Sequence, residues 1–162
     1  MKTLIRSLAI ISTAALWAAS AYAGASRIGN AYYEDIFPVP ACNNINVCLA
    51  VSSSATPSDT FLRMHHFYCK VIIANSTSTV LSDLSLELWT APPSTSGATQ
   101  IKRVPISFSQ PVASAGNNVY SIDHDILLAT GPGRYVVFEA NVTQVAPIGL
   151  TCAITGDLLP PQ

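Results

Sequence analysis

The three histidines of the chain stand in the two places where its sequence is best suited to chemistry. His65 and His66 are adjacent, and His124 lies between Asp123 and Asp125. Imidazole and carboxylate groups bind transition metals, and an imidazole can act as a general base. If the fold brings His124 close to His65 or His66, these side chains form a candidate metal site or the centre of an exported hydrolase.

Strand geometry argues against that convergence. Neighbouring residues of an extended strand point to opposite faces, so His65 and His66 are expected on opposite sides. The same alternation places Asp123 and Asp125 opposite His124. We therefore predict no catalytic, cofactor-binding or metal residue, and we interpret the histidines as surface side chains.

Other catalytic patterns are missing from the sequence. It has no Gly-x-Ser-x-Gly elbow for a nucleophilic serine and no Cys-x-x-Cys pair for zinc. A carboxylate pair of the glycosidase kind stays open, with Glu34, Asp35 and Glu87 as possible members, because such pairing is spatial. The sequence favours a protein that is not an enzyme and has no cofactor.

The four cysteines, Cys42, Cys48, Cys69 and Cys152, favour two disulfides, for which three connectivities exist. Cys42 and Cys48 flank a short turn-rich segment and can close a local ring. Cys69 and Cys152 then remain, and a bond between them ties an early strand to the last one.

The first 23 residues have the three regions of a cleavable signal peptide. Lys2 and Arg6 are basic, residues 7–19 are apolar, and Ala21-Tyr22-Ala23 is a small-x-small cleavage pattern before Gly24. The apolar run is shorter than the about 20 residues of a spanning helix. We expect a bacterial protein that is periplasmic or secreted, with no membrane span after cleavage.

Charge is scarce in the sequence. Charged residues make up 10% of the chain, against about 25% in ordinary soluble domains. Without Lys2 and Arg6 the mature chain carries a net charge of −3. Its only adjacent basic pair is Lys102-Arg103, so nucleic-acid binding is not expected. A weakly charged surface suits a protein that packs against a protein partner or itself.

Short apolar runs with period-two alternation, separated by clusters of Ser, Thr, Asn, Pro and Gly, indicate an all-β fold. Turn formers such as Ala91-Pro92-Pro93-Ser94 and Ala146-Pro147-Ile148-Gly149 separate the expected strands. Pro105 places its strand at a sheet edge. The pattern predicts seven or eight strands in two packed antiparallel sheets. The core-facing positions are expected to be Phe67, Cys69, Val71, Ile73, Leu84, Leu86, Leu88, Val104, Ile106, Phe108, Tyr120, Ile122, Ile126, Leu128, Val136, Phe138, Ala140, Val142, Leu150, Cys152 and Ile154.

The segment Gly131-Pro132-Gly133-Arg134-Tyr135-Val136-Val137 resembles the tight turn and tyrosine before the sixth strand of immunoglobulin-like and fibronectin-like sandwiches. The resemblance covers about ten residues and implies a single immunoglobulin-like antiparallel β-sandwich. Those families would bury Val137 and Glu139, whereas the alternation here favours burying Val136, Phe138 and Ala140. We therefore infer the architecture and not membership of either family.

We divide the chain into a signal peptide (1–23), an N-terminal arm with the first disulfide loop (24–45) and a β-sandwich region (46–162), with 24–162 as one domain. The expected function is a non-enzymatic structural or protein-interaction module in the periplasm or at the cell surface. Chaperone-assembled bacterial pilins resemble the chain in length, signal and low charge, which implies strand donation by the arm 24–41 as an alternative. Such pilins usually end in a strand with a penultimate tyrosine, whereas this sequence ends Pro160-Pro161-Gln162.

Overall fold

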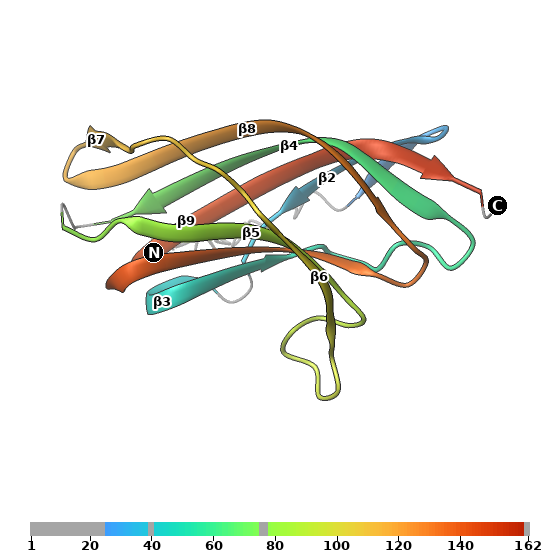
Figure 1. Ribbon diagram of the computed structural model, residues 1–162, viewed down its shortest axis with the longest axis horizontal. Helices are drawn as coiled ribbons and strands as arrows, with labels where there is room; N and C mark the ends of the chain where they lie inside the picture. The colour runs from blue at the N-terminus through green and yellow to red at the C-terminus, as the bar shows by residue number, and fades with distance from the viewer. Residues whose placement is uncertain (1–24, 39–40, 75–77, 161–162) are drawn as a thin grey trace, which may run out of the picture.

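The computed structural model describes residues 25–38, 41–74 and 78–160 (Figure 1). In this part of the chain the elements are strands joined by turns, without a helix, and paired strands are antiparallel. The all-β class is thus confirmed, while the expected signal peptide lies outside the described residues. The strands are β1 (Ser26–Ile28), β2 (Ala31–Ile36), β3 (Cys42–Val51), β4 (Phe61–Ile73), β5 (Leu81–Trp89), β6 (Gln100–Pro105), β7 (Val112–Ser114), β8 (Asn117–Thr130) and β9 (Tyr135–Leu159).

The fold is organised around β9, which is 25 residues long. Its first part, 135–142, lies between β3 and β5, and β6 extends that group. Its last part, 148–159, pairs with β4 along its length and with β2 over residues 152–157, and β1, β8 and β7 extend this second group. We call the two groups the β3 half and the β4 half. In Figure 1, β8 and β4 run along one side of the molecule and β3, β5 and β6 along the other.

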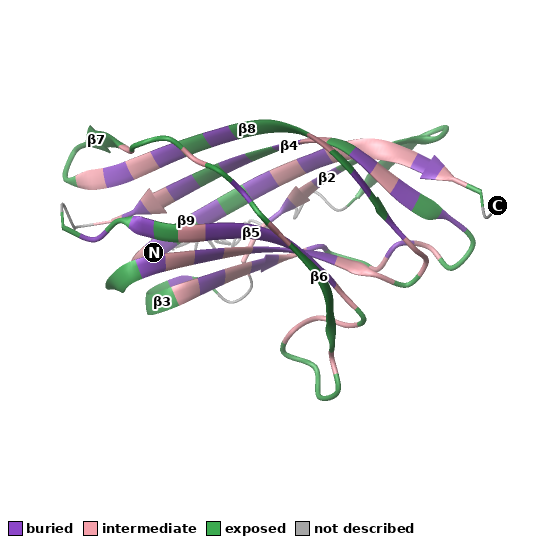
Figure 2. Ribbon diagram, in the orientation of Figure 1, coloured by how far each residue is buried: buried purple, intermediate pink, exposed green. Residues whose placement is uncertain are grey.

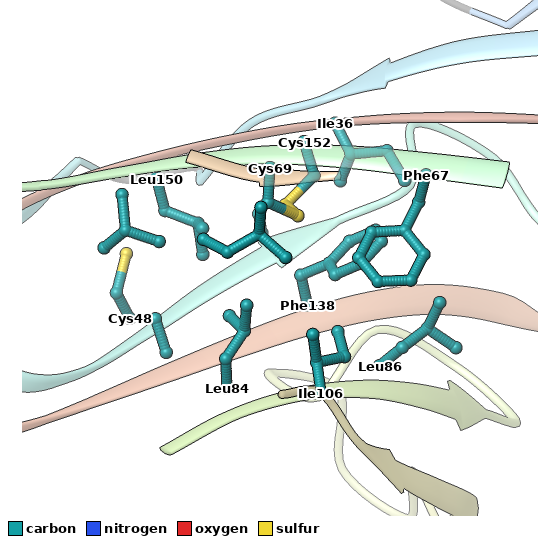
Figure 3. Packing of buried hydrophobic residues seen from close by; sticks show 14 of the residues in the cluster. Ile36, Cys48, Phe67, Cys69, Leu84, Leu86, Ile106, Phe138, Leu150 and Cys152 are labelled. Carbon is teal, nitrogen blue, oxygen red and sulfur yellow. A yellow bond between two sulfur atoms is a disulfide. The ribbon is translucent and has the colours of Figure 1, made fainter. Parts of the chain in front are cut away.

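The two halves enclose one hydrophobic core. Phe67 of β4 and Phe138 of β9 meet there, with ring centroids 5.5 Å apart. Figure 3 shows Leu84, Leu86 and Ile106 beside Phe138, facing the Cys69–Cys152 bond and Ile36. Period-two burial along much of β4, β8 and β9, visible as colour bands in Figure 2, follows from the alternation of side chains across a strand.

The start of β9 follows the alternation of the sequence. Val136, Phe138 and Ala140 belong to the core cluster, as predicted. Val137 is also fully buried, but it is outside that cluster because it points to the other face of the sheet. The inward set that immunoglobulin-like families use at these positions is therefore absent from the core of the described residues.

Three details of the expected strand pattern are wrong. The nine strands belong to one hydrogen-bonded sheet rather than to two separate sheets, because β9 runs through both halves. Ala146-Pro147-Ile148-Gly149 does not separate two strands, because β9 continues through it and exchanges its β3 and β5 partners for β4. The described residues contain nine strands rather than seven or eight, since β1 and β7 have only three residues each and are too short to show alternation. β7 turns into β8 at Ala115 and Gly116, both of which have positive φ, as a tight hairpin turn requires.

Two disulfides join the pairs that the cysteine spacing favours. Cys42 is bonded to Cys48 within β3, and Cys69 of β4 is bonded to Cys152 of β9. Disulfides persist in oxidising compartments, so these bonds suggest an extracellular or periplasmic environment. The described residues include no helix with the length and apolar character needed to span a membrane.

Candidate functional site

The two adjacent histidines lie on the same outer face of β4, and their expected placement on opposite faces is wrong. A shift in register between Met64 and His66 inserts one extra residue into β4 relative to β9, whereas against β8 the same point has the extra residue on the β8 side. Met64 and Phe67 are both buried, and the two residues between them point outward. A β-bulge has this effect, because the added residue interrupts the alternation.

Gly156 of β9 makes the bulge possible. It pairs with Met64, and a Cβ atom built on it would lie 2.2 Å from the carbonyl oxygen of Arg63. The backbone of the bulge therefore occupies the space that any larger residue would need. A glycine within a strand was the available sequence signal for this irregularity.

The two imidazoles engage different carboxylates. His65 Nε2 lies 2.9 Å from Asp157 Oδ2, which Arg63 Nη2 also contacts at 3.0 Å. His66 lies between the two aspartates of β8, with Nδ1 3.0 Å from Asp125 and Nε2 3.2 Å from Asp123. Both ring nitrogens of His66 are thus committed to carboxylate oxygens.

His124 is directed to the other face of β8 and does not join the other two histidines. It pairs with Phe67 in the register, its ring centroid is 5.8 Å from that of Phe67, and its Nε2 donates to the carbonyl oxygen of Ser107 at 2.8 Å. This bond ties the segment after β6 to β8. Among the described residues, no three His, Cys, Asp or Glu side chains form a group able to hold a metal ion.

A polar cluster on the outer face of the β3 half was missed by sequence reasoning. Arg103 of β6 forms ion pairs with Asp83, with Glu139 at 3.2 Å and with Glu87 at 3.6 Å. Glu87 and its neighbour Ser85 are buried, although alternation predicts an exposed outer face for β5. The cover comes from cross-strand partners and from Trp89, whose indole N–H donates to Glu87 at 2.7 Å. The alternation of residues within one strand cannot predict burial that comes from side chains on neighbouring strands.

Burial makes Glu87 a source of pH dependence. Desolvation raises its pKa above the ordinary value, an effect that the bond from Trp89 and the charge of Arg103 partly oppose. The folded chain then binds this proton more tightly than the unfolded chain, so the free energy of unfolding falls as pH rises from the ordinary glutamate pKa of about 4.3 through the raised one. Glu87→Gln removes this titration.

As pH rises across that window, we expect the free energy of unfolding of Glu87→Gln to increase relative to that of the parent. Above the window, where Glu87 is ionised in both folded and unfolded parent, the difference should be constant. Urea unfolding at a series of pH values measures it. Parallel stability profiles for the two proteins would contradict this account.

The N-terminal arm is fastened into its own sheet by Glu34. This glutamate of β2 is fully buried. Its carboxylate accepts a hydrogen bond from the hydroxyl of Tyr32 and two from Ser53, one from the backbone N–H at 2.6 Å and one from Oγ at 2.8 Å. Burial and the bond to Glu34 raise the pKa of Tyr32 far above its ordinary range. β2 also pairs with β9 over six residues, from Ala31 to Ile36. The arm therefore occupies a sheet position within its own chain.

The outer edge of β3 is the strand edge that is least protected against pairing with another strand. Within the described residues β3 pairs with β9 alone, so one side of its backbone has no strand partner. None of its ten residues is charged. Register shifts disturb its first half, and Asn44 has positive φ, which leaves Val47–Val51 as the regular part.

A groove of about 400 Å³ runs beside this edge. Along β3 it is lined by Ile45, Val47, Leu49 and Val51, which alternate with the core residues Cys48 and Ala50. Pro93 and Ser94, from the connection between β5 and β6, form the other wall. The absence of charge was readable in the sequence, but the edge position of β3 was not, because strand order depends on pairing.

Other strand edges among the described residues are protected. β8 pairs with β7 only at Asn117–Val119, and beyond that its edge carries Asp123, His124 and Asp125. β6 carries the Lys102-Arg103 pair, and β1 is only three residues long. Charged residues and short strands are the usual means of blocking unwanted strand pairing. Comparison of the chain with models of known protein families gives no match, and comparison with curated proteins gives none either.

Proposed function

We propose that the processed chain is a non-enzymatic protein-interaction module, exported to the bacterial periplasm or cell surface, which takes an extended strand from another polypeptide at the edge of β3. One observation carries the proposal: β3 is a ten-residue edge strand without a charged residue. Natural proteins usually block such edges, so one that is left open is suited to pairing.

The groove supports the proposal by indicating what the added strand is like. Main-chain hydrogen bonds along an edge give affinity for any extended segment, and side-chain pockets give selectivity. Here most of the adjoining side chains are apolar, Asn43 and Ser94 being the polar ones, and no lining residue is charged. The preferred partner is therefore an extended, uncharged segment with apolar residues at alternate positions.

The proposal also includes the export of the chain and its architecture. Cleavage of residues 1–23, and an immunoglobulin-like description of the two packed halves, are part of the proposal. The two disulfides support the oxidising compartment. Strand donation by the arm 24–41 stays the second candidate. It requires β2 to leave β9 and Glu34 to leave Ser53, whereas pairing at the free edge of β3 displaces no strand among the described residues.

A synthetic peptide tests the edge directly. It copies residues 45–53 with Cys48→Ser, and two lysines are added at its end for solubility. We expect amide hydrogen exchange in β3 to slow when the peptide binds, because the N–H groups that face away from β9 acquire partners. A second peptide with Leu49→Pro lacks a donor N–H and is expected to bind more weakly.

A matched pair of protein variants completes the test. Leu49→Lys places a charge beside the edge, opposite Glu139 in the register, so the chain can still fold. Leu127→Lys places the same charge on β8, where Leu127 is 85% exposed. Peptide binding should be lost in the first variant and kept in the second. Equal binding by both variants, or binding without slower exchange in β3, would overturn the proposal.

A further inference from the structure

We infer that the strand added at β3 belongs to a second copy of this chain, so that two molecules pair β3 with β3 in an antiparallel, two-fold symmetric arrangement. This inference rests on the proposed function of the β3 edge and names its partner. In such an isologous contact each copy offers the same surface, so the edge must be complementary to itself.

The regular part of β3 meets that condition. With Leu49 on the two-fold axis, Val47 of one copy faces Val51 of the other, Cys48 faces Ala50, and Leu49 faces itself. This is the centre that uses all five residues of the regular segment Val47–Val51. Antiparallel pairing about it keeps each side chain on the same face as its partner, because paired positions have the same parity.

Side-chain chemistry favours the same arrangement. Like charges placed opposite each other destabilise strand pairs, and identical strands that pair about their centre would bring equal charges together. β3 has no charge to bring together. On the outer face the contact instead forms a row of valine and leucine side chains from both copies, whose stabilisation comes from apolar cross-strand contact.

The new sheet also joins the two grooves. Val47, Leu49 and Val51 line the groove in each copy, so the row that crosses the axis is continuous with both grooves. The β3 half of each molecule contributes β3, β9, β5 and β6, and the pairing makes one sheet from both sets. No strand pairing of the described residues has to be broken to form it.

Sedimentation equilibrium of the processed, disulfide-bonded chain tests the inference. We expect a mass that rises with concentration to that of two chains. Leu49→Lys brings two ammonium groups together at the axis and is expected to weaken association by about tenfold or more. Leu127→Lys should associate as the parent does. A parent that stays monomeric at all concentrations, or a Leu49→Lys variant that associates normally, would overturn the inference.

Symmetric cross-linking measures the register. In Leu49→Cys the two new thiols face each other, and residues opposite each other in antiparallel strands have Cα atoms about 4.5–5.5 Å apart, within reach of a disulfide. We expect a covalent dimer on mild oxidation. Val47→Cys should not form one, since its new thiol faces Val51 of the other copy. Efficient cross-linking of Val47→Cys alone would contradict this register.

The two proposals fail separately. If the parent is monomeric but binds the peptide of residues 45–53 with slower exchange in β3, the second-copy inference is wrong and the edge still accepts strands from another source. If the parent is monomeric and the peptide does not bind, the proposed function is wrong as well.

Discussion

Replacing Cys69 and Cys152 together by alanine is expected to lower the free energy of unfolding by about 4–5 kcal/mol. The bond closes a loop between residues 83 positions apart, so its loss frees a long stretch of the unfolded chain. Both cysteines are fully buried in the core, where the alanines would also leave unfilled space. Urea unfolding monitored by tryptophan fluorescence measures the change.

The matched control is the double variant Cys42→Ala, Cys48→Ala. These residues are six positions apart, and the same reasoning gives a loss of about 2 kcal/mol. The Cys42–Cys48 bond should therefore contribute about half as much to the free energy of unfolding as the Cys69–Cys152 bond. Equal losses for the two double variants would show that loop length does not decide the effect.

Gly156→Ala is expected to destabilise the fold by about 3 kcal/mol, at the upper end of the usual cost of overpacking. The new methyl group would need the space held by the carbonyl oxygen of Arg63, and a backbone atom cannot rotate away as a side chain does. Either β4 and β9 separate locally or the bulge is lost. In the second case His65 is forced out of its contact with Asp157.

Gly149→Ala is the control for this prediction. Gly149 also lies in β9, but its added Cβ would meet Ile72 at 3.6 Å, an ordinary contact distance. A change within about 0.5 kcal/mol is expected, as at other exposed positions. Thermal unfolding compares the two variants, with the histidine NMR signals as a second readout. If Gly156→Ala were as stable as Gly149→Ala, the bulge would not depend on the glycine.

Sequence patterns predict the inner faces of this fold well, for a local reason. In β4, the apolar residues Phe67, Cys69, Val71 and Ile73 recur at every second position, and all four are in the core. The pattern needs only the period of an extended strand. Pro105 similarly predicts an edge strand, and β6 pairs with β5 alone.

What the sequence does not predict depends on neighbours across the sheet. The bulge reverses the expected side of His65, and its cause, Gly156, is on another strand. Glu87 is buried because Arg103 and Trp89 lie beside it. The β3 edge has a visible lack of charge, but its place at the end of the β3 half follows only from pairing with β9.

The position of β9 in the chain has a consequence for biogenesis. It follows every other strand in sequence, yet it is the central partner in both halves, between β3 and β5 in one and between β2 and β4 in the other. During synthesis, the strands that flank β9 are made before the central strand with which they pair. Neither half is therefore complete until β9 has been made, and that one segment then completes both halves.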